Sequence, residues 1–163
     1  MHLELIVQDL YQPSVVDEHT WVNWFENWLQ TPALGLPPGD AYELSLRLTS
    51  DGEIQALNAQ FRQQDRPTDV LSFAALEVDF PQGADNSSDS AIYLGDIIIS
   101  VDTAVRQAPE HGYSLRKELA WLASHGLLHL LGWDHPDEAS LLLMLDRQSS
   151  LLRSSGFRDL VDA

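Results

Sequence analysis

The sequence contains no cysteine and little positive charge. The absence of cysteine excludes disulfide scaffolds, thiolate zinc sites and cysteine nucleophiles. Nine Lys and Arg residues stand against 25 Asp and Glu residues, which gives a formal net charge of −16. So acidic a chain is not suited to coating nucleic acid through bulk charge, and any recognition of phosphate has to be local.

Long apolar runs are also absent, since none approaches the roughly 18 residues of a membrane span. The first residues, Met1 to Leu5, have neither the basic start nor the long apolar stretch of a signal peptide. We therefore expect a cytoplasmic protein that does not associate with a membrane. The 163 residues fit a single domain, 1–163, and their hydrophobic content of 44% is ordinary for a globular protein.

Four segments in the first hundred residues have the hydrophobic pattern of strands. Two alternate apolar and polar residues, and two are short apolar runs of the buried type. The predicted strands span 2–7, 42–48, 70–73 and 96–99.

Helical patterns separate these strands and fill the rest of the chain. The first predicted helix carries Trp21, Trp24, Phe25 and Trp28 at three- and four-residue spacing. Such a stripe could stack on nucleic-acid bases, but it is more typical of a helix face buried on a sheet, and we adopt that interpretation. The predicted helices run from Ser14 to about Gln30, Ser50 to about Gln63, Asp102 to Ala108, Ser114 to Leu131 and Asp137 to about Ser155.

Local signals define several boundaries of these elements. Ser50 and Glu53 have the spacing of a capping box, Pro109 is expected to stop a helix, and Gly132 is placed to end one in the left-handed conformation. The acidic segment 77–90 is expected to form a mobile loop. The order of elements predicts an α+β fold, a small mixed sheet covered by helices.

Three of the six histidines fall within eleven residues, from His125 to His135. His125 and His129 are four residues apart, so on a helix they lie on the same face. Gly132 permits the turn that brings His135 back toward them. A histidine pair alone is usually surface decoration, but the glycine and third histidine reproduce the spacing of the long metzincin zinc signature. Three imidazoles suit zinc and leave a fourth position open, as in catalytic sites.

One position departs from the protease pattern. Those proteases carry glutamate directly after the first histidine, where it acts as general base, whereas this chain has Gly126. Peptide hydrolysis by that route is therefore disfavoured. RNA carries its own nucleophile, the 2′-OH beside the scissile phosphate, so phosphodiester cleavage is a coherent alternative, with either that hydroxyl or water attacking.

Two arginines lie in the segment before the third predicted strand. Arg62 or Arg66 could pair with a phosphate and stabilise the charge that develops during its attack. From these residues alone, surface ion pairs with Asp65 and Asp69 are the favoured interpretation.

Together these residues resemble the YbeY-type endoribonucleases, also called rRNA maturation factors. The segment Ser114 to Glu118 also resembles the start of the family's histidine helix. The resemblance implies an α+β fold with the metal histidines on a central helix and the turn after it. The matching blocks are Leu57–Arg62, Thr68–Phe73, Gly95–Ile97 and His125–His135.

The resemblance also implies site residues and a function. It implies one Zn²⁺ per chain bound by His125, His129 and His135, with Arg62 and His125 as catalytic residues. Members cut single-stranded RNA, act in 16S rRNA 3′-end maturation and ribosome quality control, and work with rRNA precursors and the small ribosomal subunit. The alternatives are a non-catalytic zinc-containing ribosome assembly factor and, less favoured, a metallopeptidase-like hydrolase.

Several positions depart from the family's pattern or have open roles. Ala74 replaces a usual proline, and Trp133 replaces a usual tyrosine and so lacks its hydroxyl. Asp96 could support the site or simply end a strand. Asp134 could orient a ligand histidine or, as we favour, cap the turn. The role of Arg66 stays open.

Overall fold

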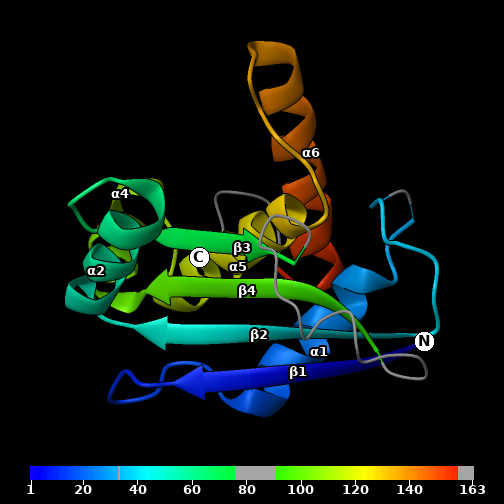
Figure 1. The fold of residues 1–163 in the computed structure, drawn as a ribbon, viewed down its shortest axis with the longest axis horizontal. Helices are drawn as coiled ribbons and strands as arrows, with labels where there is room; N and C mark the ends of the chain where they lie inside the picture. The colour runs from blue at the N-terminus through cyan, green and yellow to red at the C-terminus, as the bar shows by residue number, and fades with distance from the viewer. Residues whose placement is uncertain (33, 76–90, 158–163) are drawn as a thin grey trace.

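A four-stranded mixed sheet organises the chain in a computed structural model, which describes residues 1–32, 34–75 and 91–157. The strand order is β1-β2-β4-β3, with parallel pairing of β1 to β2 and of β2 to β4. The β3 strand runs antiparallel to β4 and forms one edge of the sheet (Figure 1). The strands are β1 (His2–Asp9), β2 (Ala41–Thr49), β3 (Val70–Ala74) and β4 (Ile92–Ser100).

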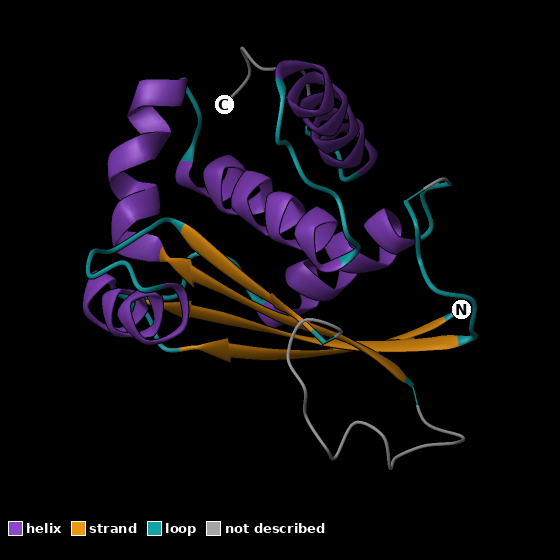
Figure 2. Ribbon diagram, turned by 45° about the horizontal axis from the view of Figure 1, so that its top comes forward, coloured by secondary structure: helices purple, strands orange, loops and turns teal. Residues whose placement is uncertain are grey.

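Helices cover this sheet, mainly on one face (Figure 2). The main hydrophobic core lies between the sheet and α1, α5 and α6, and a smaller cluster joins Ile54 of α2 to Leu71 and Ile98. This arrangement confirms the predicted α+β class. The described helices are α1 (Glu18–Leu29), α2 (Asp51–Arg62), α4 (Val101–His111), α5 (Leu115–Leu130) and α6 (Glu138–Ser154).

The aromatic stripe of α1 is part of the core, as predicted. Trp21, Phe25 and Trp28 are 0% exposed, and Trp24 is 5% exposed. The indole N–H of Trp28 donates to the carbonyl oxygen of Leu151 at 3.0 Å, which ties α1 to α6. These rings are therefore not available to stack on bases.

Two predicted helix starts differ in detail from the structure. The α1 helix begins at Glu18 rather than Ser14, because the Asp17 side chain accepts the backbone N–H of Thr20 at 2.8 Å and caps the helix there. The predicted capping box of α2 is wrong, since Ser50 makes no side-chain cap. Glu53 instead accepts hydrogen bonds from the side chains of Arg47 and Thr49, both at 2.6 Å.

Two other predicted boundaries are wrong. Pro109 does not stop α4, which continues to His111 although the proline lacks the N–H of one ladder bond. The β4 strand begins at Ile92 rather than Asp96 and passes through Gly95 at a φ of +138°. A Cβ at Gly95 would collide with the carbonyl oxygen of Phe73, so only glycine lets the paired strands continue here.

The helices that frame the histidines begin and end close to prediction. Ser114 caps α5 by accepting the backbone N–H of Lys117 at 3.1 Å, and Asp137 caps α6 within a capping box. Gly132, at a φ of +96°, turns the chain after α5. The predicted loop 77–90 lies outside the described residues. Among the described helices, none has the length and hydropathy needed to cross a bilayer.

Candidate metal centre and its cleft

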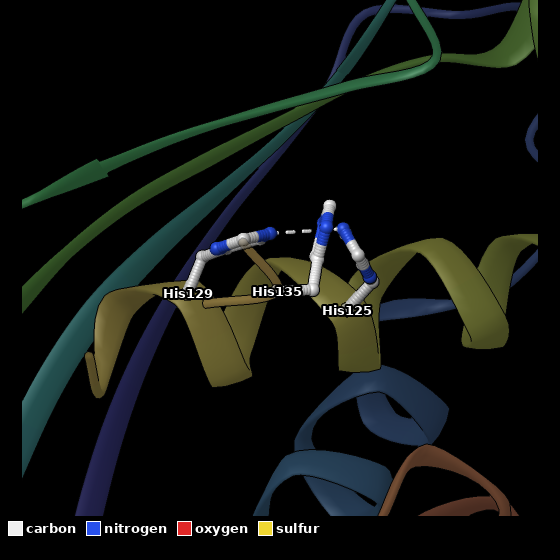
Figure 3. Close-up of side chains that lie close together, drawn as sticks. All are labelled: His125, His129 and His135. Atoms are coloured by element: carbon white, nitrogen blue, oxygen red, sulfur yellow. Dashed lines mark hydrogen bonds between the residues drawn. The ribbon is translucent and has the colours of Figure 1, made fainter. Parts of the chain in front are cut away.

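The three predicted metal ligands converge at the C-terminal end of α5. His125 and His129 lie one turn apart on the same face of this helix, and the turn at Gly132 brings His135 back beside them (Figure 3). His125 and His129 are partly buried, whereas His135 is exposed. The cluster is therefore open to solvent on the side of His135.

The spacing of the imidazole nitrogens fits a single metal ion. One ring nitrogen from each of the three histidines lies within 4.8 Å of the others, and Nε2 of His125 is 3.0 Å from Nε2 of His129. Two nitrogens bound tetrahedrally to one zinc ion lie about 3.3 Å apart, so small side-chain shifts suffice to bind it. The donor set is all nitrogen, which suits zinc and leaves a coordination position open.

A buried glutamine orients the first histidine. Oε1 of Gln148 in α6 lies 3.1 Å from Nδ1 of His125, and its amide nitrogen donates to the carbonyl oxygen of Trp121 at 3.3 Å. An amide oxygen can only accept, so Nδ1 of His125 carries the proton. The lone pair of this ring is therefore on Nε2, the nitrogen that faces His129.

Burial keeps the ligand histidines neutral. Desolvation lowers the pKa of both His125 and His129 below the ordinary value of 6.5. At His125 the hydrogen bond to Gln148 and the negative charge of Asp69 oppose this shift without reversing it. Neutral imidazole is the form that binds a metal ion, so the pocket favours binding at neutral pH.

The histidines form part of the wall of a cleft of about 870 Å³. The size is in the range of small-molecule sites. Besides His125 and His129, its lining includes Arg62 from α2, Asp69 just before β3 and Ser72 within β3. The cleft thus joins two candidate metal ligands to a cation and a carboxylate.

The two arginines that the sequence offers as phosphate ligands differ in their position relative to the cleft. Arg62 lines the cleft, donates to the carbonyl oxygen of Ser72 at 2.8 Å and packs its guanidinium over the Phe73 ring at 4.8 Å. Arg66 is exposed and does not line the cleft. The structure therefore brings Arg62, and not Arg66, to the wall that carries His125 and His129.

Close packing at position 126 leaves no room for a side chain. Gly126 therefore both fits this contact and lacks a basic group. A Cβ at this position would lie 2.8 Å from Cγ2 of Ile97 and 3.1 Å from Oγ of Ser72. Ser72 also donates to the carbonyl oxygen of Gly126 at 3.1 Å. The helix therefore lies directly on β3 and β4, and no side chain fits where the proteases place their glutamate.

The residues with open roles have local partners. Asp96 accepts hydrogen bonds from the hydroxyls of Ser45 and Tyr93 and does not line the cleft, although Tyr93 does. Asp134 accepts the backbone N–H of His135 at 2.8 Å, as expected for a residue that caps the turn. The indole of Trp133 donates to the carbonyl oxygen of Leu34 at 2.8 Å, which anchors the turn to the preceding loop.

Sequence analysis did not identify every residue that shapes this site. Gln148 carries no signal in the sequence, since it lies 23 residues beyond His125 in another helix. The sequence predicts Asp69 only as a surface partner for arginine. Its place in the cleft follows from the pairing of β3 with β4, which spacing along the chain does not reveal.

Comparisons with known proteins agree on one family. The sequence profile of the family described as Endoribonuclease YbeY matches residues 7–156. The chain is 57% identical over 146 residues to an Endoribonuclease YbeY of Nostoc sp., covering 90% of this chain and 79% of the relative. It is 51% identical over 163 residues to that of Cyanothece sp., covering 98% of this chain and 96% of the relative.

A solved structure shares the fold. The solution structure of TM1509 from Thermotoga maritima aligns with a TM-score of 0.57 and 26% sequence identity. The alignment covers 93% of this chain and 88% of that one. The arrangement of sheet and helices described above is therefore shared with an experimentally determined protein.

Proposed function

The chain belongs to the YbeY family of endoribonucleases, and from this premise we propose that it is a zinc-dependent endoribonuclease specific for single-stranded RNA. The observation that carries the proposal is the juxtaposition in one cleft of the His125 and His129 imidazoles with the Arg62 guanidinium. Metal-binding nitrogens beside a fixed cation suit the cleavage of a phosphodiester, whose transition state gathers negative charge.

One zinc ion per chain is proposed, held by His125, His129 and His135. When bound, it would act as a Lewis acid that polarises a phosphoryl oxygen of the substrate. The fit rests on the nitrogen donors and on Gln148, which fixes the proton of His125 on Nδ1 and directs Nε2 into the cluster. His125 is thus both a ligand and a residue on which catalysis depends.

Arg62 is proposed to hold the scissile phosphate. Its contacts with Ser72 and Phe73 fix the guanidinium at the cleft wall before substrate arrives. A planar, permanently charged group can form paired hydrogen bonds to phosphate oxygens and stabilise added charge there. Pre-positioning avoids the cost of ordering a long side chain during the reaction.

The biological role proposed is maturation of the 16S rRNA 3′ end and ribosome quality control in the cytoplasm, with residues 1–163 acting as one domain. The proposed partners are rRNA precursors, the small ribosomal subunit and its associated proteins. The net charge of −16 supports dependence on such a partner, because it opposes tight binding to free RNA. Affinity of the isolated protein for RNA should be weak and fall further with salt.

Four variants test the proposed activity. Cleavage of a single-stranded RNA should be lost in His125→Ala and in Arg62→Ala, while the matched controls His19→Ala and Arg66→Ala, both at exposed positions, should retain it. Circular dichroism and urea unfolding establish that each variant is folded. Cleavage unaffected by either of the first two changes would overturn the proposal.

A zinc-stripped sample separates the enzyme from a non-catalytic assembly factor. The proposed enzyme keeps its fold without zinc and regains cleavage when zinc returns. A purely structural zinc predicts unfolding on removal and no RNA cleavage by the zinc-bound protein either. A peptidase is disfavoured because no glutamate side chain fits at Gly126.

A further inference from the structure

Asp69 is the only carboxylate among the cleft-lining residues in the part of the chain that the structure describes. It lies directly before β3 and is partly buried. Its negative charge reaches His125, where it partly offsets the effect of burial on the pKa. A carboxylate in this place has no role in the functions assigned above to the histidines and Arg62.

Asp69 is held in one orientation by hydrogen bonds. Oδ1 accepts the backbone N–H of Val70 at 2.8 Å. With its amide nitrogen turned toward the carboxylates, Gln107 of α4 donates to Oδ2 of Asp69 at 3.2 Å and to Oε2 of Glu118 at 3.3 Å. A carboxylate oxygen has two lone pairs, so Oδ2 can accept a second hydrogen bond from a bound molecule.

Gln107 is itself anchored by a buried acid. The Glu118 side chain on α5 is 0% exposed, and its Oε1 accepts a hydrogen bond from Nδ1 of His111 at 2.8 Å. A buried carboxylate is costly unless its partners are fixed. Glu118 therefore restrains the Gln107 amide on the side away from the cleft, and Gln107 in turn restrains the Asp69 carboxylate at the cleft.

We propose that Asp69 is a further catalytic residue, the acceptor of the proton from the attacking hydroxyl, and that Gln107 and Glu118 are its positioning residues. This inference rests on the proposed nuclease function. The attacking oxygen, of the 2′-OH or of water, forms its bond to phosphorus as its proton passes to Oδ2 of Asp69. The bond from phosphorus to the leaving oxygen breaks, and that oxygen keeps the electron pair and takes a proton from water. The hydroxide left by that water recovers the proton from Asp69, which restores the carboxylate.

The other groups of the cleft are unsuited to this task. Gly126 has no side chain, and the facing Nε2 atoms of His125 and His129 belong to the proposed metal cluster. The Arg62 guanidinium offers N–H donors and no acceptor for a proton. Burial raises the pKa of Tyr93 far above its ordinary value of 10, so its phenol stays protonated and its hydroxyl donates to Asp96.

The test compares Asp69→Asn with Asp65→Asn in the zinc-loaded full chain cutting single-stranded RNA. Asparagine keeps the oxygen that accepts the Val70 N–H but is not a base. We expect kcat to fall about 10²- to 10⁴-fold in Asp69→Asn, with KM, zinc affinity and the urea unfolding midpoint unchanged. Asp65 is exposed and accepts a hydrogen bond from Gln55 at 3.0 Å, so its variant should keep wild-type values.

Gln107→Leu tests the positioning role without changing the acid. It should lower kcat by about 10- to 100-fold and leave KM and zinc affinity unchanged, because only the hydrogen bond that orients the Asp69 carboxylate is lost. Gln60→Leu, at an exposed position of α2, is its control.

The outcomes separate this inference from the function on which it rests. Wild-type protein that fails to cut RNA with zinc bound overturns both. Wild-type cleavage together with unchanged kcat in Asp69→Asn overturns the role of Asp69 alone. A loss of activity in Asp69→Asn that is matched by an equal loss of zinc binding also overturns it, since Asp69 would then act on the metal site.

Discussion

Gln148, a fully buried residue of α6, accepts a hydrogen bond from Nδ1 of His125 over 3.1 Å. This contact joins the last helix to the histidine cluster and determines which nitrogen of His125 is available. Groups that bind a ligand histidine from behind typically change metal affinity 10- to 100-fold when they are removed. Gln148 therefore supports the candidate metal centre from outside its ligand set.

Replacing Gln148 by leucine should weaken zinc binding by about 10- to 100-fold, because the ring of His125 loses its fixed orientation and proton position. Competition with a chromophoric chelator measures the affinity. Gln60→Leu, at an exposed position of α2, should bind zinc like the wild type. Equal affinities in the two variants would show that His125 needs no such support.

Gly126→Ala should destabilise the fold by up to about 2 kcal/mol. Alanine favours a helix by roughly 1 kcal/mol over glycine, but overpacking a core costs about 1–3 kcal/mol. The added Cβ would lie 2.8 Å from Cγ2 of buried Ile97, so the cost of overpacking should exceed the gain in helix propensity.

Urea unfolding of Gly126→Ala and of Gly52→Ala tests this balance. Gly52 lies in the first turn of α2 with no atom within 4 Å of an added Cβ. Its variant should gain roughly 0.5–1 kcal/mol. A stable Gly126→Ala protein would mean that α5 does not lie directly on the sheet.

The free energy of unfolding of the metal-free protein should depend on pH through His125. Its folded pKa is lowered below the ordinary 6.5, so below that pH the unfolded chain binds a proton that the folded chain does not. Stability contributed by the neutral ring is present above about pH 6.5 and is lost as the pH falls. The difference in unfolding free energy between wild type and His125→Gln should therefore shrink from pH 7 to pH 5.

Urea titrations with chelator present measure this difference at each pH. His19→Gln, at an exposed position of α1, serves as the control and should follow the wild type. A wild-type advantage over His125→Gln that stays constant across this range would argue against the lowered pKa.

The parts of the fold that local patterns determine could be predicted from the sequence. The period of two predicted β1 and β2, and short apolar runs predicted β3 and β4. The spacing of the aromatic residues predicted the buried face of α1, because such a pattern follows directly from burial on one side. The three-histidine cluster could also be predicted, since its members lie within one helix and the turn after it. Here sequence distance and spatial distance agree.

Features made by contacts between distant segments could not be predicted. Gln148 and Asp69 reach His125 through tertiary packing, and Glu53 binds Arg47 and Thr49 instead of closing a capping box. Pro109 was predicted to end α4, but the helix continues through it for two residues. For Gln148, Asp69 and Glu53, a partner from another part of the fold decides the outcome.

The central claim is that one zinc ion on the histidine cluster enables the cleft to cut RNA. The direct measurement is the rate of single-turnover cleavage of a single-stranded RNA by metal-stripped protein as zinc is added back. The account predicts no cleavage at zero zinc, a linear rise, and saturation at one zinc per chain. Cleavage at full rate without metal, or none at one bound zinc per chain, would contradict it.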